Sequence, residues 1–98
     1  MSEQIRLVVF FDAKAGEEAA LEAATRACIP PTRQEAGCLE YTLHRDRSDA
    51  SRLVLIETWK SQAALDAHME TPHLKQMFAV LERVTRSGAI IHRLEELA

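Results

Sequence analysis

Two segments of this chain have the pattern of β-strands that are apolar on both faces. Residues 5–11 (IRLVVFF) and 52–59 (RLVLIETW) carry β-branched, aromatic and leucine side chains on both alternations, which favours strands. Successive side chains of a strand point to opposite faces of its sheet, so both faces of these strands need a cover. This requirement restricts the fold more than any other feature of the sequence.

Two further segments complete a predicted sheet. Residues 38–45 (CLEYTLHR) alternate, with Leu39, Tyr41 and Leu43 on one side and polar residues on the other. That pattern is typical of a strand with one wetter face. Residues 87–97 close the chain as a fourth strand.

Segments with apolar residues at helical spacing lie between these strands in the sequence. The first begins at Gly16 and runs to Cys28, after which Pro30-Pro31 is expected to break or kink the helix. Ser61 is placed to cap a short helix. Thr71-Pro72 then starts another helix, because threonine is a favoured N-cap and proline is favoured at the first helical position.

The resulting order, βαββαβ, predicts an α+β fold of the ferredoxin-like type, with a four-stranded antiparallel sheet in a single domain of residues 1–98. The helices of this fold cover one face of the sheet. The first and third strands are central and apolar on the other face as well, and such a patch would be exposed in a monomer. A second copy of the chain is the simplest cover, so the pattern predicts a homodimer.

Charge and hydropathy exclude several partners. The net charge is −3 and lysine and arginine form no block, which argues against a nucleic-acid partner or an anionic membrane surface. No apolar run reaches membrane-spanning length, and the N-terminus lacks the pattern of a signal peptide. These features indicate a cytoplasmic protein.

Two histidines flank the predicted helix junction. His68 shares a helical stripe with Ala64 and Leu65 and so points inward. It is either a core imidazole held by a backbone carbonyl or a general base, since its pKa lies near neutrality. His73 lies near a helix N-terminus, where a capping or surface role competes with a role in a site. Because the two straddle a predicted break, no metal site is expected.

Glu57 is the one carboxylate on an apolar strand face. It needs either a cationic partner, with Arg45 and Arg93 as the candidates, or a raised pKa that would suit acid–base chemistry. Trp59 ends the same face, as a core residue or as the wall of a pocket. Tyr41 is expected to pack, with its hydroxyl needing a partner if it is buried.

Three pieces of the sequence together resemble the antibiotic biosynthesis monooxygenase family, which includes quinol monooxygenase-like proteins. They are EAGCLEY (35–41), IETWKS (56–61) and AHMETPH (67–73). The resemblance implies a dimeric α+β barrel with an apolar cavity between the helices and the concave sheet face. It also implies oxidation of a small aromatic quinol or phenol by O2 without flavin, haem or metal, so no cofactor is expected.

The resemblance also implies roles for residues that fall on the family's motif. His68 would be the base or a hydrogen-bond partner, and Glu57 would be a catalytic carboxylate that orients the reacting groups. The substrate would contact the side chains of Trp59, His73, Tyr41 and Phe78.

Two relatives of this family lead to other expectations. Haem-degrading members carry an asparagine and an axial histidine where this chain has Val9 and Phe78, so haem degradation is disfavoured. An isomerase of a phosphorylated autoinducer sugar shares the TPH pattern, although no phosphate cradle is visible here. A small-molecule-binding or stress-response dimer without catalysis is the remaining alternative.

Overall fold

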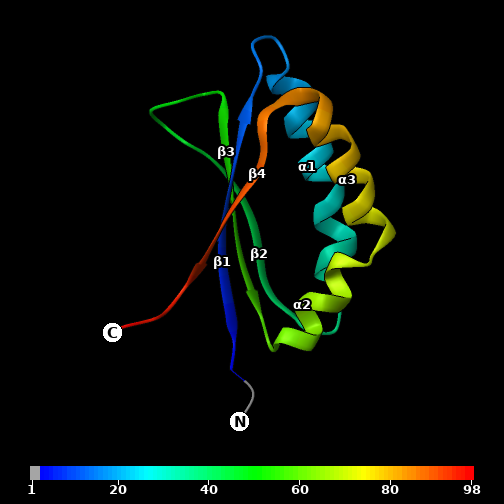
Figure 1. Cartoon of the computed structure of the whole chain (residues 1–98), viewed down its shortest axis with the longest axis vertical. Helices are drawn as coiled ribbons and strands as arrows, with labels where there is room; N and C mark the ends of the chain where they lie inside the picture. The colour runs from blue at the N-terminus through cyan, green and yellow to red at the C-terminus, as the bar shows by residue number, and fades with distance from the viewer. Residues whose placement is uncertain (1–2) are drawn as a thin grey trace.

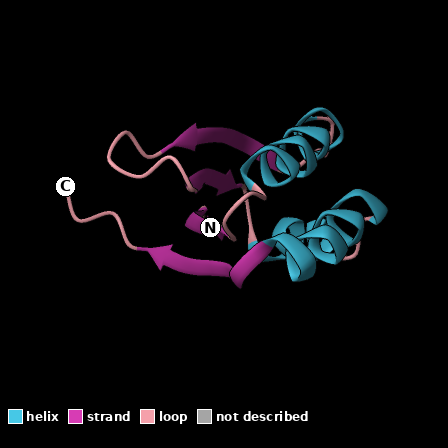
Figure 2. Ribbon diagram, turned by 90° about the horizontal axis from the view of Figure 1, so that it is seen from above, coloured by secondary structure: helices cyan, strands magenta, loops and turns pink. Residues whose placement is uncertain are grey.

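The structure is a computed structural model that describes residues 3–98 as a sheet layer and a helix layer (Figures 1 and 2). The chain follows the predicted α+β order, βαββαβ, with two consecutive helices in the second helical position. The elements are β1 (Ile5–Ala13), α1 (Glu18–Arg33), β2 (Cys38–Arg45), β3 (Arg52–Trp59), α2 (Gln62–Met69), α3 (Pro72–Val84) and β4 (Thr85–Leu94).

The four strands form one antiparallel sheet in the order β2-β3-β1-β4, which is the ferredoxin-like arrangement. The two doubly apolar strands, β1 and β3, are therefore central, as predicted. They pair along their whole length, with Ile5 opposite Trp59 and Asp12 opposite Arg52. All three helices lie on one side of the sheet (Figure 2).

The core fills the space between these two layers. From β1, every second side chain faces the helices, and Phe11 is completely buried. From α3, buried residues recur every three or four positions, as expected for an amphipathic helix. The buried side chains of α3 are Leu74, Met77, Leu81 and Val84.

The longest helix, α1, has 16 residues and runs through Pro30 and Pro31, so the predicted break is wrong. Neither proline has an N–H, which leaves the carbonyls of Arg26 and Ala27 without their helical donors. Both of those residues are exposed, so water can hydrate the two carbonyls. Among residues 3–98, no helix is both long and apolar enough to cross a membrane.

A β-bulge in β2 moves Leu39 out of the core, contrary to the sequence pattern. Cys38 pairs with Trp59 and Glu40 with Thr58, so Leu39 is an extra residue on the β2 side. Its side chain is 53% exposed. Beyond the bulge the alternation is restored, and Tyr41 is buried as predicted.

β4 begins at Thr85, directly after the last residue of α3, and ends at Leu94, whereas the sequence predicted residues 87–97. The helix and the strand follow each other directly, and the Thr85 hydroxyl forms hydrogen bonds on both sides of this junction. It donates to the carbonyl of Leu81 at 2.7 Å and accepts from the amide of Gly88 at 2.8 Å. Gly88 has a φ of +70°, a backbone conformation that favours glycine.

Within residues 3–98, no helix covers the second face of the sheet (Figure 2). Val8, Phe10, Val54 and Ile56 of the two central strands are half-buried there. We refer to these four residues as the open-face patch. The C-terminal segment leaves the body of the protein on the same side and carries Leu97, which is 87% exposed.

Candidate functional site

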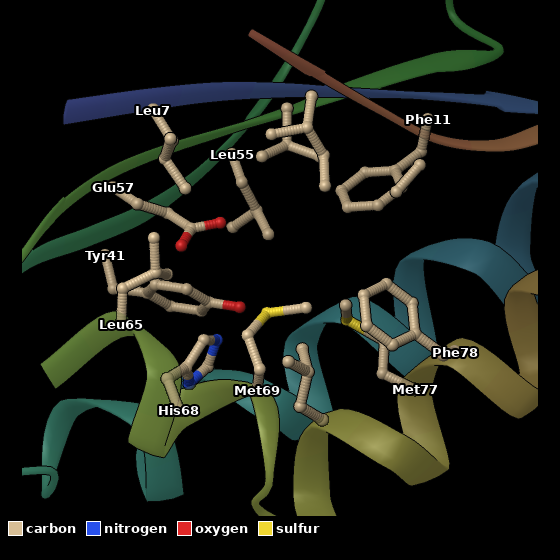
Figure 3. Close-up of a pocket in the computed structure, with 14 residues that line it drawn as sticks. Leu7, Phe11, Tyr41, Leu55, Glu57, Leu65, His68, Met69, Met77 and Phe78 are labelled. Atoms are coloured by element: carbon tan, nitrogen blue, oxygen red, sulfur yellow. The ribbon is translucent and has the colours of Figure 1, made fainter. Parts of the chain in front are cut away.

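A small apolar cavity lies between the sheet and helices α2 and α3 (Figure 3). Its volume is about 30 Å³, which is room for one or two water molecules. Typical ligand pockets hold about 300–1,000 Å³, so a ring-sized ligand requires the lining side chains to move apart. Among the residues that the structure describes, the polar lining residues are Tyr41, Glu57 and His68, and no lysine or arginine lines the cavity.

His68 projects from α2 into this cavity and is only 2% exposed. Its helix is fixed at both ends. The Ser61 hydroxyl caps the start by accepting from the amide of Ala64 at 3.1 Å, and the Thr71 hydroxyl donates to the carbonyl of His68 at 2.8 Å. The indole of Trp59 packs against the imidazole, with ring centroids 4.4 Å apart. Packing and capping together therefore hold the imidazole in place.

The hydrogen-bond partner of His68 is a carboxylate, and not the backbone carbonyl that is expected for a core imidazole. Nδ1 of His68 lies 2.8 Å from Oε2 of Glu35. Burial lowers the pKa of His68, while the bond to Glu35 and its negative charge oppose that shift, and the nearby His73 adds to it. His68 is therefore neutral near pH 7, the state in which an imidazole can accept a proton.

Glu57 faces His68 across the cavity from strand β3 (Figure 3) and is 5% exposed. The indole Nε1 of Trp59 donates to its Oε1 at 2.9 Å. Burial raises the pKa of Glu57, the hydrogen bond from Trp59 opposes the shift, and the charge of Glu35 adds to it. The site thus holds a carboxyl group that keeps its proton to a higher pH than usual.

The cationic partners expected for Glu57 are absent from its surroundings in the described residues. Arg45 bonds to Glu22 on α1, and Arg93 donates to the side-chain amide of Gln62 at 2.8 Å. Both arginines are exposed, so the expectation of an ion pair with Glu57 is wrong. The alternative expectation, a raised pKa, agrees with the buried position of this carboxyl group.

Tyr41 contributes the third polar group of the cavity. It is 2% exposed, and its hydroxyl lies 3.8 Å from Sγ of Cys28. Its ring meets the imidazole of His68 edge to face, with centroids 5.6 Å apart. Burial raises the pKa of Tyr41, so the hydroxyl remains a hydrogen-bond donor at neutral pH.

Glu35 is the site residue that the sequence analysis missed. It lies in the turn between α1 and β2, where the backbone passes very close to α2. A Cβ at Gly37 would lie 2.2 Å from the Cβ of Ala64, so only glycine fits at this contact. The close approach brings Glu35 within reach of His68, and a glycine two residues after a carboxylate was the available signal.

The structure separates the six predicted site residues into two groups. Tyr41, Glu57, His68 and Phe78 line the cavity. Trp59 is fully buried behind Glu57 and His68 and does not line it. His73 lies outside the cavity as well, and its Nε2 is 2.8 Å from the same Glu35 oxygen that bonds to His68.

Glu35, His68 and His73 form a cluster of groups that can bind metal ions. Their donor atoms all lie within 4.8 Å of one another. From the sequence, the break between the two helices was expected to keep the two histidines apart. In the structure, however, both rings converge on one carboxylate from opposite sides of that break.

Comparison with known proteins identifies the family. Residues 4–80 match the family described as antibiotic biosynthesis monooxygenase, so the chain belongs to that family. This agrees with the resemblance drawn from its motifs.

Individual relatives are similar over at least 92% of the chain. It is 36% identical over 91 residues to the Mycobacterium tuberculosis protein named "Putative monooxygenase Rv0793", covering 92% of this chain and 89% of the relative. The crystal structure of PA3566 from Pseudomonas aeruginosa has a TM-score of 0.92 and 38% identity, covering 100% of this chain and 98% of the other. The crystal structure of SO0527 from Shewanella oneidensis has a TM-score of 0.87 and 31% identity, covering 96% of this chain and 93% of the other.

Proposed function

We propose that this protein is a monooxygenase that oxidises a small aromatic quinol or phenol with O2 and needs no cofactor. The observation that supports this most is the pairing inside one apolar cavity of a buried neutral imidazole, His68, with a buried carboxyl group, Glu57. An aromatic substrate suits the apolar lining. A base and an acid facing the same small space suit proton transfer.

The reaction balances without an external reductant. His68 takes the proton of a substrate hydroxyl at Nε2, and the resulting anion is electron-rich enough to reduce O2. The C–O bond that forms gives a peroxide anion, which takes its proton from the imidazolium of His68. Loss of the C–H proton then breaks the O–O bond, so one oxygen atom stays on the ring carbon as a carbonyl and the other leaves as water. The quinol supplies all four electrons.

Three other residues of the cavity complete the proposed roles. Glu57 orients the substrate hydroxyl and exchanges the second proton, which its raised pKa permits. Tyr41 donates a hydrogen bond to the substrate, and Phe78 contacts the ring of the substrate. Trp59 supports the site from behind, by holding Glu57 through its indole N–H.

Substrate entry requires the cavity to open, because its present volume is about 30 Å³. Met69 is the most suitable side chain to move. It lines the cavity on α2, is 41% exposed and is unbranched, so it can change rotamer at low cost. Leu65, one turn earlier on the same helix, is only half-buried.

A second copy of the chain is part of this proposal. The open-face patch of Val8, Phe10, Val54 and Ile56 lies on the side of the sheet that no helix covers. Pairing the patches of two copies would remove this apolar surface from water, and a standard interface of about 800 Å² per partner is enough for a stable dimer.

Oxygen uptake by metal-free protein with a panel of hydroquinones and anthrones tests the activity. We expect protein-dependent uptake that falls about 10²- to 10⁴-fold in His68→Gln, the usual contribution of a general base. Gln76→Ala, an exposed position on α3, is the matched control and should keep full activity. A panel without uptake would favour a binding protein without catalysis, and full activity in His68→Gln would exclude His68 as the base.

A further inference from the structure

Glu35 joins two histidines through a single oxygen atom. Its Oε2 lies 2.8 Å from Nδ1 of His68 and 2.8 Å from Nε2 of His73. The three residues come from three separate segments: the α1–β2 turn, helix α2 and helix α3. Glu35 is largely shielded, with a side chain 16% exposed, and His68 is almost completely buried.

This contact determines which nitrogen of His68 carries the proton. An ionised carboxylate can only accept hydrogen bonds, so Nδ1 of a neutral His68 must be the N–H that donates to Glu35. The lone pair is then on Nε2, the nitrogen that does not contact Glu35. Because the Nδ1 edge of the ring is turned towards Glu35, the Nε2 edge is the one left to face the cavity that His68 lines (Figure 3).

We propose that Glu35 is the positioning residue of the site. It holds His68 in the Nδ1–H tautomer with the basic Nε2 directed into the cavity, and it balances the positive charge when the ring takes up a proton. His73 donates to the same oxygen and so fixes the carboxylate in that position. This inference rests on the proposed function, in which His68 is the base.

The proton balance is simple. The substrate hydroxyl gives its proton to Nε2 of His68, and the proton on Nδ1 stays there, hydrogen-bonded to Glu35. The imidazolium later returns the same proton to the peroxide oxygen. Glu35 touches no reacting atom at any step, so its effect reaches the substrate only through His68.

The distances favour hydrogen bonds over a metal site. Ligand atoms around a tetrahedral Zn²⁺ with bonds of about 2.0–2.1 Å are separated by about 3.3 Å. The Glu35 oxygen is 2.8 Å from both nitrogens, the usual length of a hydrogen bond from N–H to a carboxylate. A bound metal would require both rings to move away from Glu35.

Several titratable groups face His68, and any test must distinguish their separate effects on its ring. Glu35 and His73 lie on its Nδ1 side. Tyr41 of β2 and Glu57 of β3 line the cavity with it. A change at Glu35 is therefore best followed at the nitrogens of His68 themselves, because a pH profile of the whole protein combines all of these groups.

The test is ¹⁵N NMR of the histidine rings in substrate-free protein, for the wild type, Glu35→Gln and Glu35→Asp. The wild type should show a protonated Nδ1 and an unprotonated Nε2 at His68. Glu35→Gln should shift His68 towards a mixture of tautomers, and Glu35→Asp, which keeps the charge, should retain part of the wild-type pattern. Glu70→Gln, an exposed carboxylate beside the same helix junction, is the matched control and should change nothing.

Activity provides the second measurement. Glu35→Gln should lower kcat about 10²- to 10⁴-fold with little change in KM, as expected for loss of the partner that orients a base. An unchanged His68 tautomer in Glu35→Gln would overturn the assignment, and so would Zn²⁺ binding that requires Glu35 and restores or raises activity. If the wild type shows no oxygen uptake, the proposed function fails, while the NMR result still decides what Glu35 does to His68. If Glu35→Gln does not fold, Glu35→Asp compared with Glu70→Gln decides the same question.

Discussion

At the scale of single residues, the most unusual group is Glu57. Its carboxyl group is 5% exposed. Among residues 3–98, its one side-chain hydrogen bond is the one that it accepts from the indole of Trp59. Burying a carboxylate with one donor is costly, so burial raises the pKa of Glu57 and favours the protonated form. A raised pKa also suits a group that acts as an acid, so the chemistry proposed for the site and its effect on stability have one origin.

Glu57→Gln should change how stability depends on pH. Because the folded-state pKa of Glu57 is raised, its proton is lost from the unfolded chain first, near the ordinary value of 4.5, and the folded state is then disfavoured as pH rises further. Removing the group should take away up to about 1.4 kcal/mol per pH unit of this slope. Urea unfolding from pH 4 to 8 measures it, with the exposed Glu40→Gln as control. An unchanged slope would contradict the raised pKa.

The titration of His68 should appear in the rate of reaction. Burial lowers the pKa of His68, so kcat/KM for a responsive quinol should fall with decreasing pH only below about 6.5, the ordinary value for histidine. In His68→Gln this acidic limb should disappear along with most of the activity. A wild-type limb above pH 6.5 would indicate a different base.

At the scale of elements, the α2–α3 junction controls the geometry of the site. Thr71 acts on both helices at once. Its hydroxyl accepts from the amide of Leu74 at 3.4 Å, at the start of α3, and donates to the carbonyl of His68 at 2.8 Å, near the end of α2. One side chain therefore fixes the angle between the helices that carry His68 and His73.

Thr71→Ala should destabilise the protein by about 1 kcal/mol, the usual cost of losing an N-cap, and should weaken the site as well. Thr71→Ser keeps the hydroxyl and should behave almost as the wild type. Thermal unfolding gives the stability difference, and the His68 ¹⁵N signals report on the ring. Equal stabilities of the alanine and serine variants would show that the cap contributes little.

The elements also show what the sequence could predict. The strand order followed from the order of the elements, because β1 and β3 are central in a βαββαβ fold, and their two apolar faces agreed with that position. Leu39 was misplaced because a bulge changes which residues share a face, and alternation alone does not reveal an inserted residue. The continuation of α1 through Pro30-Pro31 depends on exposed carbonyls, which only the packed structure shows.

The candidate site was predicted less completely, for a similar reason. His68 and Glu57 could be found because each is a polar residue on an apolar stripe. Glu35 lies in a turn without periodicity, and its role depends on a contact with a residue 33 positions away. His73 was expected to contact the substrate. Its ring instead bonds to Glu35, in the turn between α1 and β2, and lies outside the cavity.

At the scale of the whole molecule, the sheet has two apolar faces, and the helices of the described residues, 3–98, cover one of them (Figure 2). The open-face patch is only partly shielded by its own neighbours. The guanidinium of Arg52 lies 5.0 Å from the ring centroid of Phe10, and the His92 ring meets that ring edge to face. These two side chains shield less apolar surface than a dimer interface would bury, so we expect a second copy of the chain to cover the patch.

Ile56→Lys should convert the expected dimer into a monomer. The substitution places a charge in the middle of the open-face patch, where a sheet-to-sheet contact would bury it without a partner. Light scattering at micromolar concentration measures the change, and Gln76→Lys on the exposed side of α3 is the control. A wild-type protein that is already monomeric would refute the dimer.

The junction without a loop between α3 and β4 has a consequence for how a ligand could be detected. α3 contributes Leu74, Met77 and Phe78 to the cavity, and β4 contributes Ala89 and Ile91. Because Thr85 belongs to the end of one element and the start of the next, α3 cannot shift outward without pulling on this edge strand. Amide hydrogen exchange along β4 should therefore respond when the cavity fills, which makes this strand a sensor for identifying the natural ligand.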